Sequence, residues 1–158
     1  MTDVLLLAKL IHVLGAAVLF GTGLGIAFFM YMAHRTREPA TIAAIARLVV
    51  IADALFTASA VMVQPISGAF LAWLIGYSIV EPWIVAALVF FVFVGMCWLP
   101  VVGIQLRLRD LAAEAARTSA PLPAAYDRLF RVWFWLGWPA FAGVIAIFAL
   151  MLWKPRLW

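Results

Sequence analysis

Residues 9–34 read KLIHVLGAAVLFGTGLGIAFFMYMAH, an apolar run longer than the roughly 20 residues that a transmembrane helix needs. The run carries both histidines of the chain, and a lysine lies one helical turn before the first of them. Ionisable side chains inside a bilayer are costly, so each one calls for a physical reason. This stretch indicates a membrane protein and supplies a first candidate site, His12 with Lys9.

The composition extends that conclusion to the whole chain. Of its 158 residues, 68% are hydrophobic and 11% are charged, whereas about 25% of residues are charged in soluble domains. The first apolar run continues past the length of a signal-peptide core without a convincing cleavage site, so we expect it to be retained. We predict an all-α protein, a single domain of residues 1–158, built as a four-helix transmembrane bundle with spans at about 4–33, 48–75, 82–106 and 130–153.

The basic residues predict the orientation of the bundle. Eight of them flank the first and third connections and three lie on the other side: Arg35, Arg37, Arg47, Arg107, Arg109, Arg117, Arg128 and Arg131 against Lys9, Lys154 and Arg156. The positive-inside rule then places both termini outside. Because the arginines flank apolar segments, the net charge of +4 indicates topology and not a nucleic-acid partner. The expected partners are the lipid bilayer and either a second copy of the chain or another membrane subunit.

His12 lies on a helical face of small residues. Ala8, Gly15, Ala16 and Gly23 fall within about 60° of it. Two interpretations fit: close packing against another helix, or space for a flat cofactor such as haem b, with His12 as the axial ligand of the iron and Lys9 pairing with a carboxylate. His34 lies about 33 Å further along the helix, so one haem cannot use both histidines of one chain. We expect His34 to lie at the interface, in contact with headgroups and water.

The second span carries an intramembrane polar stripe. Its members are spaced at helical intervals and should face the bundle interior: Asp53, Thr57, Gln64 and Ser67. We expect Asp53 to form an ion pair with an arginine, namely Arg47, Arg107 or Arg131, and the alternative is a proton relay. Pro65 follows Gln64 and is expected to kink the helix near the depth of His12. An ion or metal permease that uses Asp53 and Gln64 is therefore one functional alternative.

Several segments together resemble a known family: KLIHV at residues 9–13, LFGTGLGIAFF at 19–29, and WLPVVGIQLRLRD at 98–110. With PLPAAYDRLFRVWFWLGWPAF before the last span, the chain resembles the bacterial integral-membrane family named domain of unknown function 2269. The resemblance covers essentially the whole sequence. It implies a small, multi-pass protein of the bacterial inner (plasma) membrane with no established activity.

The start of the first helix also resembles two other groups, the haem-b membrane protoporphyrinogen oxidases and the copper-resistance D-type membrane proteins. The shared pattern is K-x-x-H-[IV] at residues 9–13. In those oxidases the histidine matching His12 is implicated in haem ligation, so the resemblance implies that role for His12. The sequence departs from them before His34, where it lacks their Pro-Arg pair. We therefore keep three functions open: a haem or redox-cofactor protein using His12, a permease, and an accessory subunit of a membrane complex.

Overall fold

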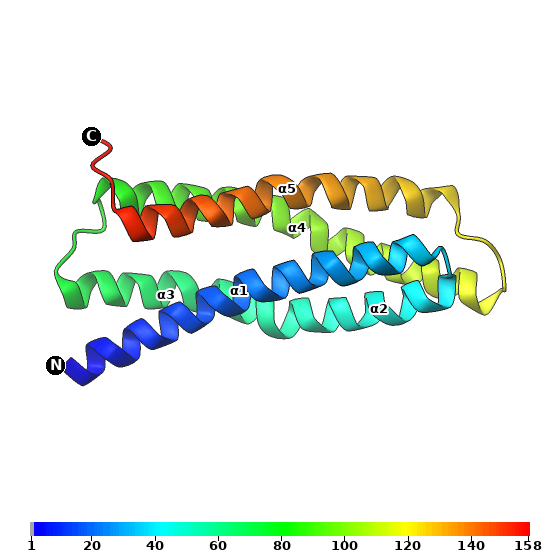
Figure 1. Cartoon of the computed structure of the whole chain (residues 1–158), viewed down its shortest axis with the longest axis horizontal. Helices are drawn as coiled ribbons and strands as arrows, with labels where there is room; N and C mark the ends of the chain where they lie inside the picture. The colour runs from blue at the N-terminus through cyan, green and yellow to red at the C-terminus, as the bar shows by residue number, and fades with distance from the viewer. Residues whose placement is uncertain (1) are drawn as a thin grey trace.

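The computed structural model describes residues 2–158, which form four long helical segments (Figure 1). The first is α1, Thr2–Thr36. The second is one continuous stretch made of α2, Pro39–Ala52, the π-helix η1, Asp53–Thr57, and α3, Ala58–Ile75. The third and fourth are α4, Pro82–Arg117, and α5, Ala124–Trp153. All four segments are long and apolar enough to cross a membrane, which confirms the predicted four-helix architecture.

Local sequence signals explain where the helices begin and end. Pro39 and Pro82 are the first residues of α2 and α4, positions where the missing N–H costs nothing and the fixed φ suits a helix. Gly76 ends α3 with a φ of +86°, and the Tyr77 N–H donates back to the Ala72 carbonyl at 2.9 Å. Pro123 precedes α5. The helices extend past the predicted spans. α2 starts at residue 39, and α4 continues through the charged segment to residue 117.

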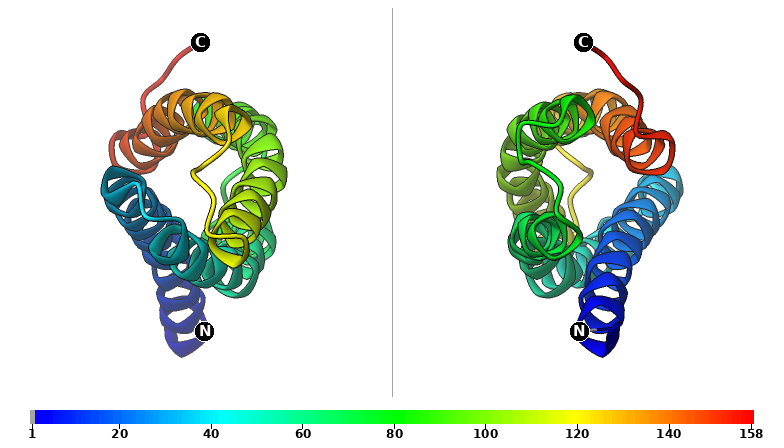
Figure 2. Two further views of the ribbon diagram at one scale, coloured as in Figure 1. Left: turned by 90° about the vertical axis from the view of Figure 1, so that its right-hand side faces the viewer. Right: turned by 90° about the vertical axis from the view of Figure 1, so that its left-hand side faces the viewer.

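Seen along their axes, the helices form a ring (Figure 2). The α2–η1–α3 segment packs against α1 and α4, and α4 packs along α5. α1 and α5 pack far less closely, and they meet mainly through aromatic side chains: Phe20 lies 4.9 Å from Phe141 and 5.5 Å from Phe148 between ring centroids. The ring is therefore closed on this side by side chains.

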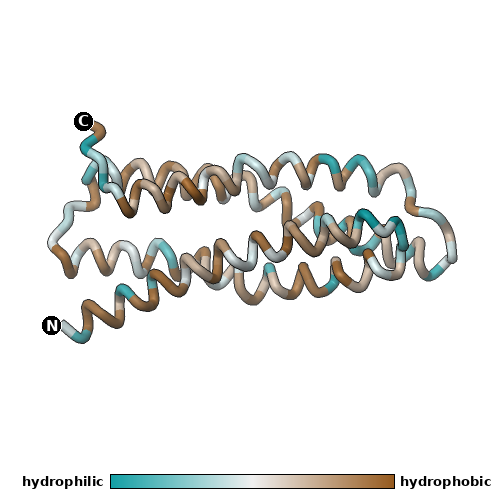
Figure 3. Tube along the Cα trace, viewed as in Figure 1, coloured by the Kyte–Doolittle hydropathy of each residue, from teal (hydrophilic) through white to brown (hydrophobic). Residues whose placement is uncertain are grey.

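The packed core lies at the end of the bundle that holds the first and third connections. It comprises buried side chains from all four segments: Ile26, Met30, Ala33, Ile42, Ala46, Val49, Leu108, Ala112, Tyr126, Phe130 and Trp133. Hydrophilic residues gather at this end, where α1 finishes and α5 begins (Figure 3). Both termini lie at the opposite end (Figure 1). Which end faces the cytoplasm stays a prediction from the basic residues.

Candidate functional site

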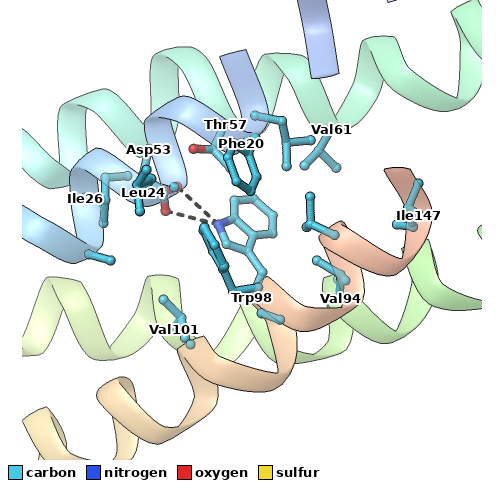
Figure 4. A pocket seen from close by; sticks show the side chains of 18 of the residues that line it. Phe20, Leu24, Ile26, Asp53, Thr57, Val61, Val94, Trp98, Val101 and Ile147 are labelled. Carbon is cyan, nitrogen blue, oxygen red and sulfur yellow. Dashed lines mark hydrogen bonds between the residues drawn. The ribbon is translucent and has the colours of Figure 1, made fainter. Parts of the chain in front are cut away.

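The middle of the bundle contains a partly open cavity of about 390 Å³ (Figure 4). Side chains from α1, η1, α3, α4 and α5 line it, and the wall is mostly aliphatic and aromatic: Phe20, Leu24, Ile26, Val61, Phe91, Val94, Val101, Phe134, Phe141, Val144, Ile147 and Phe148 are among its members. Three glycines, Gly23, Gly95 and Gly137, also line it. Ligand pockets typically have volumes of about 300–1,000 Å³, so this cavity is large enough for a small organic molecule.

Asp53 lines this apolar cavity and is almost completely buried, with 4% of its surface exposed. The indole N–H of Trp98, on α4, donates to both carboxylate oxygens, with Nε1 at 3.2 Å from Oδ1 and 3.3 Å from Oδ2 (Figure 4). A single hydrogen is thus shared between two acceptors. A carboxylate can accept about four hydrogen bonds, so most of the hydrogen-bonding capacity of Asp53 is unused by the chain.

The prediction that Asp53 forms an ion pair with an arginine is wrong. Within residues 2–158 the ion pairs are Arg37–Asp127, Arg109–Asp110 and Arg117–Glu114. Arg47 is exposed and lies six residues before Asp53, about 9 Å along the helix axis. Arg107 and Arg131 are exposed as well. Guanidinium groups remain outside the apolar middle of the bundle, where burying them would cost several kcal/mol.

Asp53 begins the single π-helical turn of the second segment, Asp53–Thr57. The Ala58 N–H donates to the Asp53 carbonyl five residues earlier, so the turn holds one more residue than an α-helical turn. Such π-bulges often occur at functional sites. The sequence Asp-Ala-Leu-Phe-Thr gives no signal for this turn, and the stripe was predicted from α-helical spacing alone.

Three residues that line the cavity each carry a buried polar atom without a hydrogen-bond partner: Thr57 Oγ1, Gln105 Oε1 and Trp133 Nε1. The three residues are only 6%, 2% and 5% exposed. Buried polar groups are nearly always hydrogen-bonded. One acceptor, one donor and one hydroxyl that can do both, all on residues that line one cavity, therefore indicate a partner that the chain does not supply.

Trp98, Gln105 and Trp133 were absent from the predicted site. A signal existed for two of them, because Trp98 and Gln105 lie seven residues apart and so share a face of α4. Trp133 lies in a Trp-rich helix, where a single tryptophan does not stand out from its neighbours. Trp135, two residues further along the same helix, is 68% exposed.

His12 lies on α1 and contacts the second segment instead of the central cavity. Its Nδ1 is 2.8 Å from Ser67 Oγ, and Ser67 Oγ donates to the Val63 carbonyl at 2.7 Å. Because the hydroxyl has only one proton, both bonds form when His12 Nδ1 donates to Ser67. This tautomer leaves the lone pair of His12 Nε2 free. Gln64 Nε2 donates to the His12 carbonyl at 2.9 Å, which ties the same two helices together.

The small-residue face around His12 makes room for these polar contacts. A side chain at Gly15 would collide with the Gln64 amide, and a Cβ at Gly68 would lie 3.2 Å from His12 Cε1. Lys9 is exposed. His12 lines neither the central cavity nor a second, apolar cavity of about 300 Å³ between α1 and α3.

The structure therefore divides the predicted stripe between two places. Asp53, Thr57 and Gln64 line the central cavity, whereas Ser67 holds His12.

His34 lies near the end of α1, and its side chain is half-buried; its expected position at the membrane interface stays a prediction. Its half-buried imidazole stacks on Phe130, with ring centroids 3.6 Å apart and planes inclined by 7°. The ring thus joins α1 to α5. Nearby, the Arg37 guanidinium donates two hydrogen bonds to Asp127, one of them at 3.1 Å, and these bonds raise the pKa of Arg37 above its ordinary value.

Comparison with known proteins gives a single assignment. A family profile described as "Predicted integral membrane protein (DUF2269)" matches residues 6–155. Neither the curated proteins nor the solved structures contain a significant match. The matched residues include all of the site described above. With four membrane-spanning helices and a family match over nearly its whole length, the chain belongs to the DUF2269 family of integral membrane proteins.

Proposed function

We propose that this protein binds a small, largely apolar molecule inside the membrane, in the cavity at the centre of its bundle. The observation that carries this proposal is the set of three buried, unpartnered polar atoms, on Thr57, Gln105 and Trp133, at the wall of an otherwise apolar cavity. Binding pockets commonly combine an apolar wall with a few polar groups that orient the ligand. Asp53 and its Trp98 partner add a fixed polar anchor to that set.

The lining supports ligand binding more strongly than ion permeation. A permeating ion must replace its hydration shell along the whole path, and apolar constrictions oppose this by dewetting. Here the polar groups are few, and the aromatic side chains of Phe20, Phe141 and Phe148 lie across the cavity wall between α1 and α5. The alternative function, an ion or metal permease, is supported only by the presence of Asp53 and Gln64 in the lining.

The proposal can be tested with 1-pyrenemethanol, a neutral fluorophore that accepts excitation energy from tryptophan. The purified protein in phosphatidylcholine nanodiscs should show saturable energy transfer with one site per chain. Gly95→Leu should abolish the saturable component, because Gly95 lines the cavity and the space beside its Cα is open. The leucine side chain would then occupy part of the ligand volume.

Gly103→Leu is the matched control. Gly103 lies on the same helix, is exposed, and also has open space beside its Cα, so this variant should bind like the wild type. Energy transfer that never saturates, or that is equal in both leucine variants, would reflect partition of the probe into lipid and would refute the proposal.

A second candidate function, haem ligation by His12, rests on a different observation. When Ser67 donates to the Val63 carbonyl, His12 Nδ1 donates to Ser67 and Nε2 is free, and metal-ligating histidines usually have their other ring nitrogen held in this way. The ring chemistry therefore fits an axial ligand, but His12 lines neither cavity; a bound haem would supply electron transfer. Purified protein supplemented with haem should show a Soret band that His12→Ala removes. A spectrum unchanged by that substitution would exclude His12 as the ligand.

A further inference from the structure

We propose that the ligand of the central cavity is an amphiphilic cation, a protonated amine attached to an apolar body, whose ammonium group binds at Asp53. This inference rests on the proposed function and specifies its ligand class. It follows from three properties of the site: an uncompensated acidic side chain, unpartnered acceptor atoms, and aromatic rings beside them.

The first property is charge. Asp53 is buried in an apolar wall, and no Lys or Arg in residues 2–158 forms an ion pair with it. The indole of Trp98, which donates to it, is neutral. Intramembrane carboxylates usually have a partner of opposite charge, and a buried ion without one is strongly destabilising. A ligand cation would supply the missing charge, whereas an anionic ligand would add repulsion.

The second property is the kind of hydrogen-bonding atom left free. Gln105 Oε1 is an acceptor and the Thr57 hydroxyl can accept as well as donate, and neither has a partner. Together with the carboxylate they offer acceptor atoms of the kind that an ammonium group, with three N–H donors and no acceptor, requires. Trp133 Nε1–H is a donor and is available to an acceptor atom on the body of the ligand.

The third property is the aromatic lining. The indole rings of Trp98 and Trp133 both line the cavity, and the faces of such rings attract cations, most strongly when water is excluded. The remaining wall is apolar and would cover the body of the ligand. A neutral alcohol could use the wall and one hydrogen bond, but it would gain neither the ion pair nor the cation–π attraction.

The test compares two probes of matched shape, 1-pyrenemethylamine and 1-pyrenemethanol, at pH 7 in phosphatidylcholine nanodiscs. We expect the amine to bind the wild type at least tenfold more tightly than the alcohol. In Asp53→Asn, whose amide oxygen can still accept from Trp98, the two probes should bind with similar affinity. Asp110→Asn is the control, because Asp110 is exposed and does not line the cavity, and it should keep the full preference.

A second variant keeps the test informative if Asp53→Asn fails to fold. Gln105→Met removes one acceptor at similar volume and should reduce the preference for the amine several-fold. Equal binding of both probes by the wild type, or a preference that persists in Asp53→Asn, would overturn the cation proposal while leaving the cavity proposal in place. If the wild type binds neither probe saturably, both proposals fail.

Discussion

Replacing Gly143 with alanine should force α4 and α5 apart. Gly143 is buried on α5, and a Cβ built there would lie 2.6 Å from Val94 Cγ2 and 3.5 Å from Phe93 Cδ1. The first distance is about 0.8 Å short of an ordinary contact of 3.4 Å. Val94 cannot turn away easily, because a β-branched side chain in a helix has one strongly preferred rotamer. Overpacking of this kind typically costs about 1–3 kcal/mol.

Gly15 provides an instructive comparison, because alanine there also collides with a side chain on another helix. The atom it would meet is the amide nitrogen of Gln64, at the end of a flexible side chain. Gln64 can move away and lose its hydrogen bond to the His12 carbonyl. Such a bond inside a membrane protein is worth about 0.6 kcal/mol on average and at most about 1.7 kcal/mol. Gly15→Ala should therefore cost less than Gly143→Ala.

The assay is reversible unfolding in mixed detergent micelles, followed by circular dichroism, with Gly137→Ala as reference. Gly137 lies on the same helix as Gly143 and has open space beside its Cα, so it shares the gain in helix propensity without the collision. We expect stability to decrease in the order Gly137→Ala, Gly15→Ala, Gly143→Ala. A Gly143→Ala protein as stable as Gly137→Ala would show that the α4–α5 contact is looser than described.

Two further predictions concern the ends of the bundle. Arg37→Gln should lower the free energy of unfolding by only about 0.2–1 kcal/mol, because the side chains of Arg37 and Asp127 are 50% and 41% exposed. A loss of several kcal/mol in the same unfolding assay would contradict a surface ion pair. In intact cells, with Cys97→Ser as background, a membrane-impermeant maleimide should label Ser78→Cys but not Ala120→Cys, since the basic residues predict that the third connection is cytoplasmic. The reverse labelling pattern would place both termini inside.

Hydropathy and helix-end signals were sufficient to predict the architecture. A bilayer requires long apolar helices, so the four spans could be identified from sequence alone. Pro82 begins α4, and residues 120–123, which hold two prolines, separate α4 from α5. The parts of the helices that extend beyond the apolar spans were harder to predict. For example, α2 starts nine residues before the predicted start of its span at residue 48.

The site was only partly predictable, for physical reasons that differ between residues. Periodicity identified Asp53, Thr57 and Gln64 as inward-facing, but it says nothing about which helix lies opposite. We expected a cation beside Asp53, whereas the fold provides the neutral N–H of Trp98. The cavity itself depends on how four helices pack together, and no single helix contains a signal for it. His12 was identified as polar and intramembrane, but its contact with Ser67 is made across 55 residues of sequence.

The most direct test of the account is NMR spectroscopy of the indole N–H groups in nanodiscs during titration with 1-pyrenemethylamine. The chain has eight tryptophans, of which Trp98 and Trp133 are expected to contact the ligand, whereas Trp73 and Trp158 are 72% and 75% exposed. We predict saturable shifts of the Trp98 and Trp133 resonances, caused by the pyrene ring, with Trp73 and Trp158 unchanged. Uniform shifts of all the indole signals, or none at Trp98 and Trp133, would contradict a ligand site in the central cavity.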